Sequence, residues 1–445
     1  MESPLLFFTD AVLRAPTIGS MLMCLAAAIV GVLVFLRKQS LLGESLSHAA
    51  YPGVVIGVMV AGALGLEEHQ SSMIAIFIMM GAFITALIGL WTIHWLVRKL
   101  RFRSDSALCF ILSSFFGIGI TLASNVQYVY SSLYRQIQSY LYGQTATMTD
   151  IHIYVYGIFS LLIVLTVVLF YKELQAMTFD RDYAKSLGIK TKPIDALLFI
   201  LITLAVVIGI RSVGVVLMSA MLIAPAVAAR QYTNKMFVMF FLAGLFGLIS
   251  GFLGNYFSVE LNNYLSLKYP TDRLVIPTGP MIVMVASVIC VVSLFFAPER
   301  GLIVRLIRIG SFRYRCMCEN LLKAIWRHSS KKEISFDEIE KYQSLSPIYL
   351  RFLLWRLSMS GWLEKLDANA YKLTVDGNLW AAKIVRLHRL WEVYLANYLG
   401  VGAERVHRNA EEMEHIITPE LERELTLLLK DPRTDPHHQP IPPRH

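Results

Sequence analysis

Two sets of carboxylate and imidazole side chains carry the chemistry of this 445-residue sequence. The larger set lies within 28 residues near the C-terminus and comprises His388, Glu392, His407, Glu411, Glu414 and His415. If residues 404–415 are helical, four of the six share one face, met by a His/Glu pair from a preceding helix. Carboxylates and imidazoles suit Mn²⁺ and Fe²⁺ as ligands. A solvated acidic face is the alternative, but such a face needs no histidines.

The smaller set is a pair in the apolar N-terminal half. Glu44 and His48 are four residues apart, so on a helix they share one face. Ionisable groups at membrane depth are costly unless they face a polar cavity or a partner. Two interpretations fit this pair: a hydrogen-bonded contact between two helices, and a transit site for manganese, iron or zinc.

The helices that must position these side chains are of two kinds: the sequence changes near Phe295 from long apolar runs to a charged, more polar composition. The chain is 56% hydrophobic with a mean hydropathy of +0.55, whereas soluble domains are about 45–50% apolar. Apolar runs long enough to span a bilayer lie near 17–36, 46–65, 74–96, 107–124, 153–171, 193–210, 213–229, 236–254 and 279–297. The seventh follows the sixth almost directly and is a candidate re-entrant segment, so we expect eight or nine spans.

The placement of the +9 net charge predicts orientation. With nine spans, loops on one side hold 18 Lys and Arg residues and loops on the other hold 5. The positive-inside rule then puts the N-terminus outside and everything after Arg300 in the cytoplasm. The first apolar run lacks a basic n-region, so we expect no cleaved signal peptide. The five cysteines suggest no disulfide framework.

Four short segments resemble the ABC-3 family of metal permeases, the membrane subunits of manganese, zinc and iron importers. They occur in the family's order within residues 10–298 and are Gly43–Gly53, Ser139–Gln144, Ser219–Ala226 and Pro277–Pro280. The resemblance implies that Glu44 and His48, in the first of them, form the transit site. The family usually has Asp where this chain has Glu44.

Residues 172–189 form the longest predicted cytoplasmic segment between spans, with apolar side chains among charges. This region resembles the family's coupling helix, which docks on the ATPase. The residues concerned are Glu173, Phe179, Asp180, Leu187 and Gly188. An interfacial helix lying on lipid is the alternative. The sequence contains no GxxxxGK[ST] pattern, so we expect no enzyme activity of its own. The implied partners are a separate ABC ATPase subunit, a second permease subunit and an extracytoplasmic metal-binding protein.

Residues 319–373 predict three helices followed by a hairpin, which is a winged helix-turn-helix. Ser346 and Pro347 are typical of a helix start. The third helix then exposes Tyr349, Arg351 and Arg356, and we expect these five residues to meet operator DNA. A winged helix used for protein contacts is the alternative.

Residues 315–442 resemble the DtxR/MntR family of metal-dependent repressors. By position, four residues match that family's metal ligands, namely His388, Glu411, Glu414 and His415. Glu392 and His407 match its ancillary site.

One part of that family's site differs in this chain. Where the family's N-terminal helix supplies further ligands, this chain has Asn320 and Lys323. Glu319 or Cys318 could replace them after a small register shift. Both halves in this order resemble the chlamydial permease–repressor fusions, and iron is the metal that this resemblance suggests.

We therefore expect a polytopic α-helical membrane protein of ABC-3 permease type with 8–9 spans, followed by a cytoplasmic winged helix-turn-helix and a helical metal-binding and dimerisation domain. The expected boundaries are 1–298 for the permease, 299–317 for a basic linker, 318–375 for the winged domain and 376–445 for the metal-binding domain.

The expected function is the membrane subunit of an ABC importer for Fe²⁺ or Mn²⁺ in a bacterial inner membrane, with Zn²⁺ a third candidate. It is fused to a dimeric repressor that takes the same metal as corepressor. The linker Arg300–Arg315 is a candidate for proteolytic release. The alternatives are a membrane-tethered metal sensor without transport, and a permease with a regulatory lid that does not bind DNA.

Overall fold

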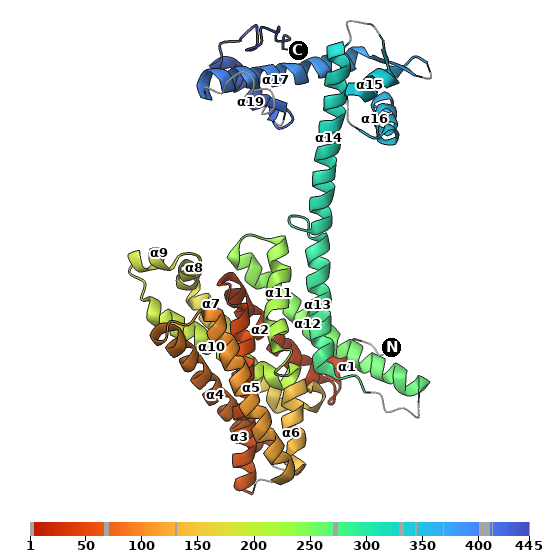
Figure 1. The fold of residues 1–445 in the computed structure, drawn as a ribbon. Helices are drawn as coiled ribbons and strands as arrows, with labels where there is room; N and C mark the ends of the chain where they lie inside the picture. The colour runs from red at the N-terminus through yellow and green to blue at the C-terminus, as the bar shows by residue number, and fades with distance from the viewer. Residues whose placement is uncertain are drawn as a thin grey trace. The chain divides into compact units, whose positions relative to one another are not determined.

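The computed structural model describes residues 4–65, 71–129, 131–269, 275–328, 333–342, 345–367, 369–399, 410, 411 and 413–444. The chain divides into two compact units, residues 1–305 and 306–445 (Figure 1). The first unit is helical, and the second combines helices with one small sheet.

Eight helices in the described part of the chain are long and apolar enough to cross a membrane. They are α2 (Arg14–Leu36), α3 (Ser40–Ala63), α4 (Ser71–Lys99), α5 (Ser104–Val129), α7 (Asp150–Leu169), α10 (Thr191–Val213), α12 (Met236–Lys268) and α13 (Thr278–Phe296). The shorter elements of this unit are α1 (Leu6–Thr9), α6 (Ser131–Tyr142), η2 (Thr145–Thr147), α8 (Tyr171–Phe179), α9 (Arg181–Ser186) and α11 (Met218–Tyr232). The predicted class, a polytopic helical membrane protein, is confirmed.

The predicted seventh span corresponds to α11, which has 15 residues and contains Pro225. At 1.5 Å per residue it is about 22 Å long, shorter than the roughly 30 Å hydrocarbon core. It packs against α2, α12 and α13. This helix therefore accounts for the difference between eight and nine predicted spans.

Polar contacts at the helix ends show that α11 runs from one end of the first unit back to the other. The start of α10 lies with the end of α2, because Asp195 pairs with Arg37 at 3.0 Å. The end of α10 lies with the end of α6, because the Gln144 amide donates to the Arg211 carbonyl. Thr278, at the start of α13, pairs with Thr145 of η2 at that same end. Since α12 finishes there too, with Asn262 bonded to Ile276, α11 must run back to where α12 begins.

Glycines allow the apolar helices to approach closely. A Cβ atom on Gly53 of α3 would lie 2.1 Å from the Gly81 carbonyl oxygen of α4. A Cβ atom on Gly31 of α2 would lie 1.8 Å from the Leu222 carbonyl oxygen of α11. In lipid the hydrophobic effect does not drive helices together, so close van der Waals contact between backbones stabilises their association.

The second unit begins its fold with α14 (Leu302–His328), so the residues expected as a linker are helical from Leu302 onward. The elements β1 (Ile334–Ser335), α15 (Phe336–Tyr342), α16 (Pro347–Met359), β2 (Leu363–Lys365) and β3 (Ala370–Leu373) follow. The strands form one antiparallel sheet in the order β1-β3-β2. The predicted winged helix-turn-helix is confirmed.

Local signals explain these boundaries. Ser335 and Glu338 exchange side-chain and backbone hydrogen bonds at the start of α15, as a capping box does. Ser346 precedes α16 in an extended conformation, with Pro347 at the first helical position. Leucines of α14 and α16 form the core of this unit: Leu321, Leu322, Leu350, Leu353, Leu354 and Leu357. The long helix α17 (Val375–Leu399) and the short α19 (Pro419–Leu428) complete the fold.

The close contact of α3 and α4 gives a stability prediction. We expect Gly53→Ala to lower the thermal unfolding midpoint in detergent, because the added methyl group meets backbone atoms of α4, and overpacking costs about 1–3 kcal/mol. Gly117→Ala is the matched control, since a Cβ at Gly117 meets nothing within 4 Å. Equal midpoints for the two variants would contradict this packing.

Candidate functional site

The candidate transit site lies on α3. His48 is 7% exposed, and its ring packs edge-on against Phe116 of α5 at 4.6 Å between ring centroids. His48 Nδ1 is buried and has no hydrogen-bond partner in the described part of the chain. Glu44 is half-buried one turn earlier. Because buried polar atoms are nearly always satisfied, this unpaired imidazole nitrogen suits a ligand role better than a structural one.

Two helices, α5 and α11, hold this segment in place. The Ser45 hydroxyl donates to the Leu108 carbonyl oxygen of α5 at 3.1 Å. Gly43 accommodates Leu222 of α11, because a Cβ at Gly43 would lie 2.7 Å from the Leu222 Cδ1 atom. The structure thus brings together the motifs at 43–53 and 219–226, which are about 170 residues apart in the sequence.

The predicted coupling segment forms two helices instead of one. Asp180 breaks it, because its carboxylate accepts hydrogen bonds from the amides of Asp182 and Tyr183 and so caps α9. Phe179 and Leu187 are 62% and 57% exposed. Gly188 has φ +79° and ends the segment, whereas Glu173 is half-buried on α8. The segment therefore presents apolar side chains, as a surface that docks on another protein would.

An ion-pair network fastens this segment to the spans. Asp195 of α10 accepts from Arg181 of α9 at 2.5 Å and from Arg37 at the end of α2 at 3.0 Å. Both Arg37 and Asp195 are largely buried. Movement of α9 is therefore linked through one carboxylate to two spans.

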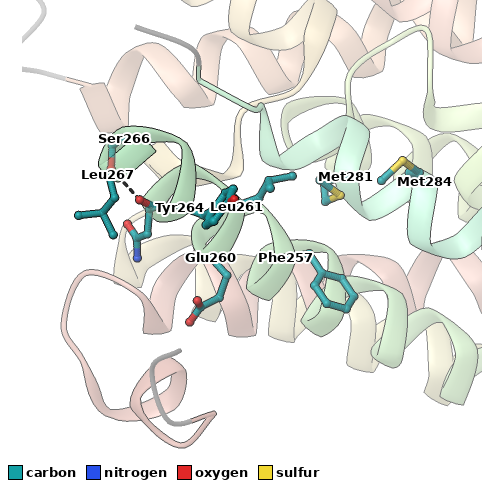
Figure 2. A pocket seen from close by; sticks show the side chains of 9 residues that line it. Phe257, Glu260, Leu261, Tyr264, Ser266, Leu267, Met281 and Met284 are labelled. Atoms are coloured by element: carbon teal, nitrogen blue, oxygen red, sulfur yellow. Dashed lines mark hydrogen bonds between the residues drawn. The ribbon is translucent and has the colours of Figure 1, made fainter. Parts of the chain in front are cut away.

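A cavity of about 860 Å³ lies between α12 and α13 (Figure 2). Its lining residues are Phe257, Glu260, Leu261, Asn263, Tyr264, Ser266, Leu267, Met281 and Met284. Apolar side chains predominate, with one carboxylate and no imidazole among these nine residues. Its chemistry therefore differs from that of the Glu44–His48 region, and we assign it no role in metal transit.

The C-terminal site is built from α17, α14 and the turn at 414–416. His388 and Glu392 lie one turn apart on α17, with His388 Nε2 3.1 Å from Glu392 Oε1. His388 Nδ1 is 2.5 Å from Glu414 Oε2. All three side chains are buried. These contacts bring together three of the six predicted C-terminal ligands, and His415 joins them beside Glu414.

A second contact joins α14 to the same turn. His415 Nδ1 is 2.6 Å from Glu319 Oε2, and His415 Nε2 is 3.5 Å from Glu414 Oε1. Glu319 was one of two replacements considered for the position-matched Asn320, and it is the residue that reaches the site. The other, Cys318, is buried nearby, and burial raises the pKa of its thiol.

Two buried side-chain atoms lack hydrogen-bond partners within the described residues: His415 Nε2 at this turn and Asn320 Oδ1 on α14. Both are atom types that bind divalent metals. Glu319 positions His415 as carboxylates position metal-ligating histidines elsewhere. These donors are of the kinds that bind a divalent metal ion.

A further residue of α14 modifies this site. Lys323 is buried, and its Nζ lies 2.6 Å from Glu414 Oε1 and 3.9 Å from Glu411 Oε1. Among the residues that the structure describes, no three His, Cys, Asp or Glu side chains converge in the arrangement of a metal site. His407 lies outside the described residues, so its predicted role is not addressed.

The protonation of the cluster follows from its contacts. Burial by itself would lower the pKa of His388, but hydrogen bonds to Glu392 and Glu414 raise that pKa above its ordinary value of 6.5. Burial would raise the pKa of Glu414, but the hydrogen bond from His388 and the charge of Lys323 lower it below its ordinary value of 4.5.

The predicted DNA contacts lie at and along α16. Arg351 and Arg356 are exposed, and Tyr349 is half-buried. The Arg351 guanidinium lies 5.3 Å from the centre of the Phe336 ring, and Arg356 Nε donates to the Tyr314 hydroxyl at 3.4 Å. Ser346 and Pro347 are exposed at the start of the helix.

Comparison with known proteins identifies both parts. Residues 9–297 match the family described as the ABC 3 transport family. The chain belongs to the ABC 3 transport family. Residues 374–443 match the iron dependent repressor metal binding and dimerisation domain.

Several known proteins are similar to this chain. A probable metal transport system membrane protein of Chlamydia trachomatis is 35% identical over 444 residues, covering 98% of this chain and 97% of that protein. The manganese transport system membrane protein MntC of Bacillus subtilis is 32% identical over 379 residues, covering 85% of this chain and 82% of that protein. The solved structure of PsaBC from Streptococcus pneumoniae in complex with Fab matches 69% of this chain and 98% of that one, at 27% identity and a TM-score of 0.56.

This ABC 3 transport family member is thus a metal permease with a repressor-type C-terminal domain. Sequence reasoning found the permease motifs and most of the polar cluster. It placed Lys323 at a ligand position of the family but did not predict its burial, because an isolated lysine in a helix gives no sign of burial. The sequence left open whether Glu319 or Cys318 replaces the position-matched residues, and the register of α14 brings Glu319 to His415.

The two pKa shifts give a pH prediction for the metal-free protein. Stability from protonated His388 is fully present below pH 6.5 and is lost as the pH rises through the raised folded-state pKa. Stability from ionised Glu414 is present above pH 4.5 and is lost as the pH falls through the lowered folded-state pKa. We therefore expect the thermal midpoint of chelator-treated protein to be highest between pH 4.5 and 6.5 and to fall above that window.

His388→Gln serves as the control, because glutamine can hydrogen-bond but does not titrate. Its midpoint should not show the alkaline fall. A wild-type midpoint that rises above pH 6.5 would show that the imidazolium does not stabilise the fold.

Proposed function

We propose that this protein is the membrane subunit of an ABC importer that carries Mn²⁺ or Fe²⁺ inward, and that its C-terminal domain is a cytoplasmic, metal-responsive repressor. One observation carries the transport proposal: in the family motif, His48 is buried in a span with an unsatisfied ring nitrogen, one helical turn from Glu44. A carboxylate and an imidazole at that depth form an attractive stopping point for a divalent ion in transit.

Energy would come from a separate ATPase subunit. The exposed Phe179 and Leu187 support docking at the α8–α9 segment. The Asp195 network then offers a physical path from that surface to α2 and α10. A second permease subunit and an extracytoplasmic metal-binding protein complete the proposed importer.

The identity of the metal ion is inferred from the types of side chain at the two sites. Both sites offer carboxylates and imidazoles, and burial raises the thiol pKa of both Cys316 and Cys318 beside the C-terminal site. Such donors favour Mn²⁺ and Fe²⁺ over ions that prefer thiolate. The name of the manganese transporter relative agrees with this preference.

The regulatory half would respond to the same ion. Metal bound at the 388–415 cluster would join α14 to α17 through side chains that already lie close together. A dimer so stiffened would present two α16 helices to successive major grooves, about 34–36 Å apart.

A second candidate, a protein-docking lid, has its own support. The exposed face of α16 carries Ile348, Phe352, Trp355 and Met359 at roughly helical spacing, and all four side chains are exposed. DNA-reading helices are usually polar on that face. Docking of this face on another protein is therefore the competing function of the winged domain.

The transport proposal predicts the effect of changing the transit residues. In vesicles that contain the permease and its ATPase, we expect His48→Ala or Glu44→Gln to reduce Mn²⁺ uptake by about tenfold or more, because loss of a metal-orienting group costs about that much. His94→Ala is a matched control, since His94 lies on α4 and its Nδ1 bonds the Leu90 carbonyl. Full uptake in the His48→Ala protein would exclude His48 from the path.

The repressor proposal predicts a metal-dependent gel shift of the protein's own promoter. We expect Arg351→Ala and Arg356→Ala each to weaken binding by about tenfold, the cost of one lost side-chain contact. Arg423→Ala, at an exposed arginine of α19, should bind as the wild type does. If no metal shifts the DNA, and Trp355→Ser changes metal uptake, the lid function is supported instead.

A further inference from the structure

The C-terminal site contains a cation supplied by the chain itself. Lys323 of α14 is 4% exposed, and its ammonium lies 2.6 Å from Glu414 Oε1. A buried charge is stable only when it is paired. In this fold the two groups neutralise each other at the point where the repressor family's ligands meet.

The same carboxylate has no free oxygen. Glu414 Oε1 is held by Lys323, and Glu414 Oε2 is held by His388 Nδ1 at 2.5 Å. His388 Nε2 is in turn 3.1 Å from Glu392. A divalent ion that binds Glu414 must therefore share or take an oxygen that Lys323 or His388 already contacts.

Other donors remain available at the same place. His415 Nε2 lies 3.5 Å from Glu414 Oε1 and makes no hydrogen bond within the described residues. Glu319 holds the opposite nitrogen of that ring at 2.6 Å. An ion arriving beside His415 would thus compete directly with the Lys323 ammonium for Glu414 Oε1.

We propose that Lys323 is a built-in competitor cation, which occupies the metal's place at Glu414 in the metal-free state and so raises the metal concentration that the sensor needs. This inference rests on the proposed metal-sensing function. The flexible four-carbon stem of lysine lets the ammonium swing away when a divalent ion takes over the carboxylate. Lys323 would then set the threshold of the response without being a ligand.

The test measures Mn²⁺ binding to the purified full-length protein by equilibrium dialysis with metal quantification. All proteins carry His48→Ala, so that the transit site does not contribute. We expect Lys323→Met to bind Mn²⁺ at least about tenfold more tightly, a change of about 1.4 kcal/mol. Lys323→Arg keeps the charge and should stay near the parent affinity. Lys383→Met, an exposed lysine of α17 above the Trp380 ring, should leave the affinity unchanged.

The possible outcomes distinguish failure of the Lys323 proposal from failure of the proposed metal-sensing function. If Lys323→Met folds only when Mn²⁺ is supplied, the proposal is supported, because the ion then replaces the missing ammonium. Equal affinities of the parent and Lys323→Met overturn the proposal but leave the sensor intact, as does a variant that stays unfolded with Mn²⁺. Absence of Mn²⁺ binding in both proteins would reject the sensor itself.

Discussion

The cost of removing a charge from water governs both candidate sites. Glu414 is buried in the second unit, and an isolated carboxylate there would shift its pKa or disrupt the fold. Lys323 and His388 compensate it from two different helices. The approach of α14 to α17 is therefore tied to an electrostatic requirement, whereas the leucine core joins α14 to α16. An ion that takes over this compensation would act on the contact between the two helices.

The membrane half solves a related problem differently. Its spans pack through glycines, with backbone atoms of α2 against α11 and of α3 against α4. Within this tight packing, His48 Nδ1 makes no hydrogen bond to the residues that the structure describes. Where everything around it is closely fitted, one unsatisfied polar atom in a span is a costly feature, and function is the usual reason that such a cost persists.

Both candidate sites contain carboxylates and imidazoles, but they differ in how far these groups are already paired within the protein. One turn from Glu44, His48 Nδ1 has no partner among the described residues, which agrees with the brief contact with an ion that we propose there. At the C-terminal cluster the carboxylate is already neutralised by Lys323 and His388. A transit site must release its ion, whereas a sensor must respond only above a threshold. The different pairing of the two sites suits these two tasks.

Sequence patterns alone determined the spans, the winged helix and most of the polar residues. Apolar run length is set by bilayer thickness, and the leucine spacing of α16 is set by the helical repeat, so both can be read along the chain. The break at Asp180 was missed, because a capping aspartate within a charged segment resembles any other surface residue.

Tertiary structure decided which charges meet. The burial of Lys323, the choice of Glu319 over Asn320 as the partner of His415, and the meeting of residues 43–53 with Leu222 all depend on how separate helices pack. Local sequence encodes the period of a helix and its ends, because those depend on near neighbours. It does not encode which groups lose their water, because that depends on residues far away in the chain.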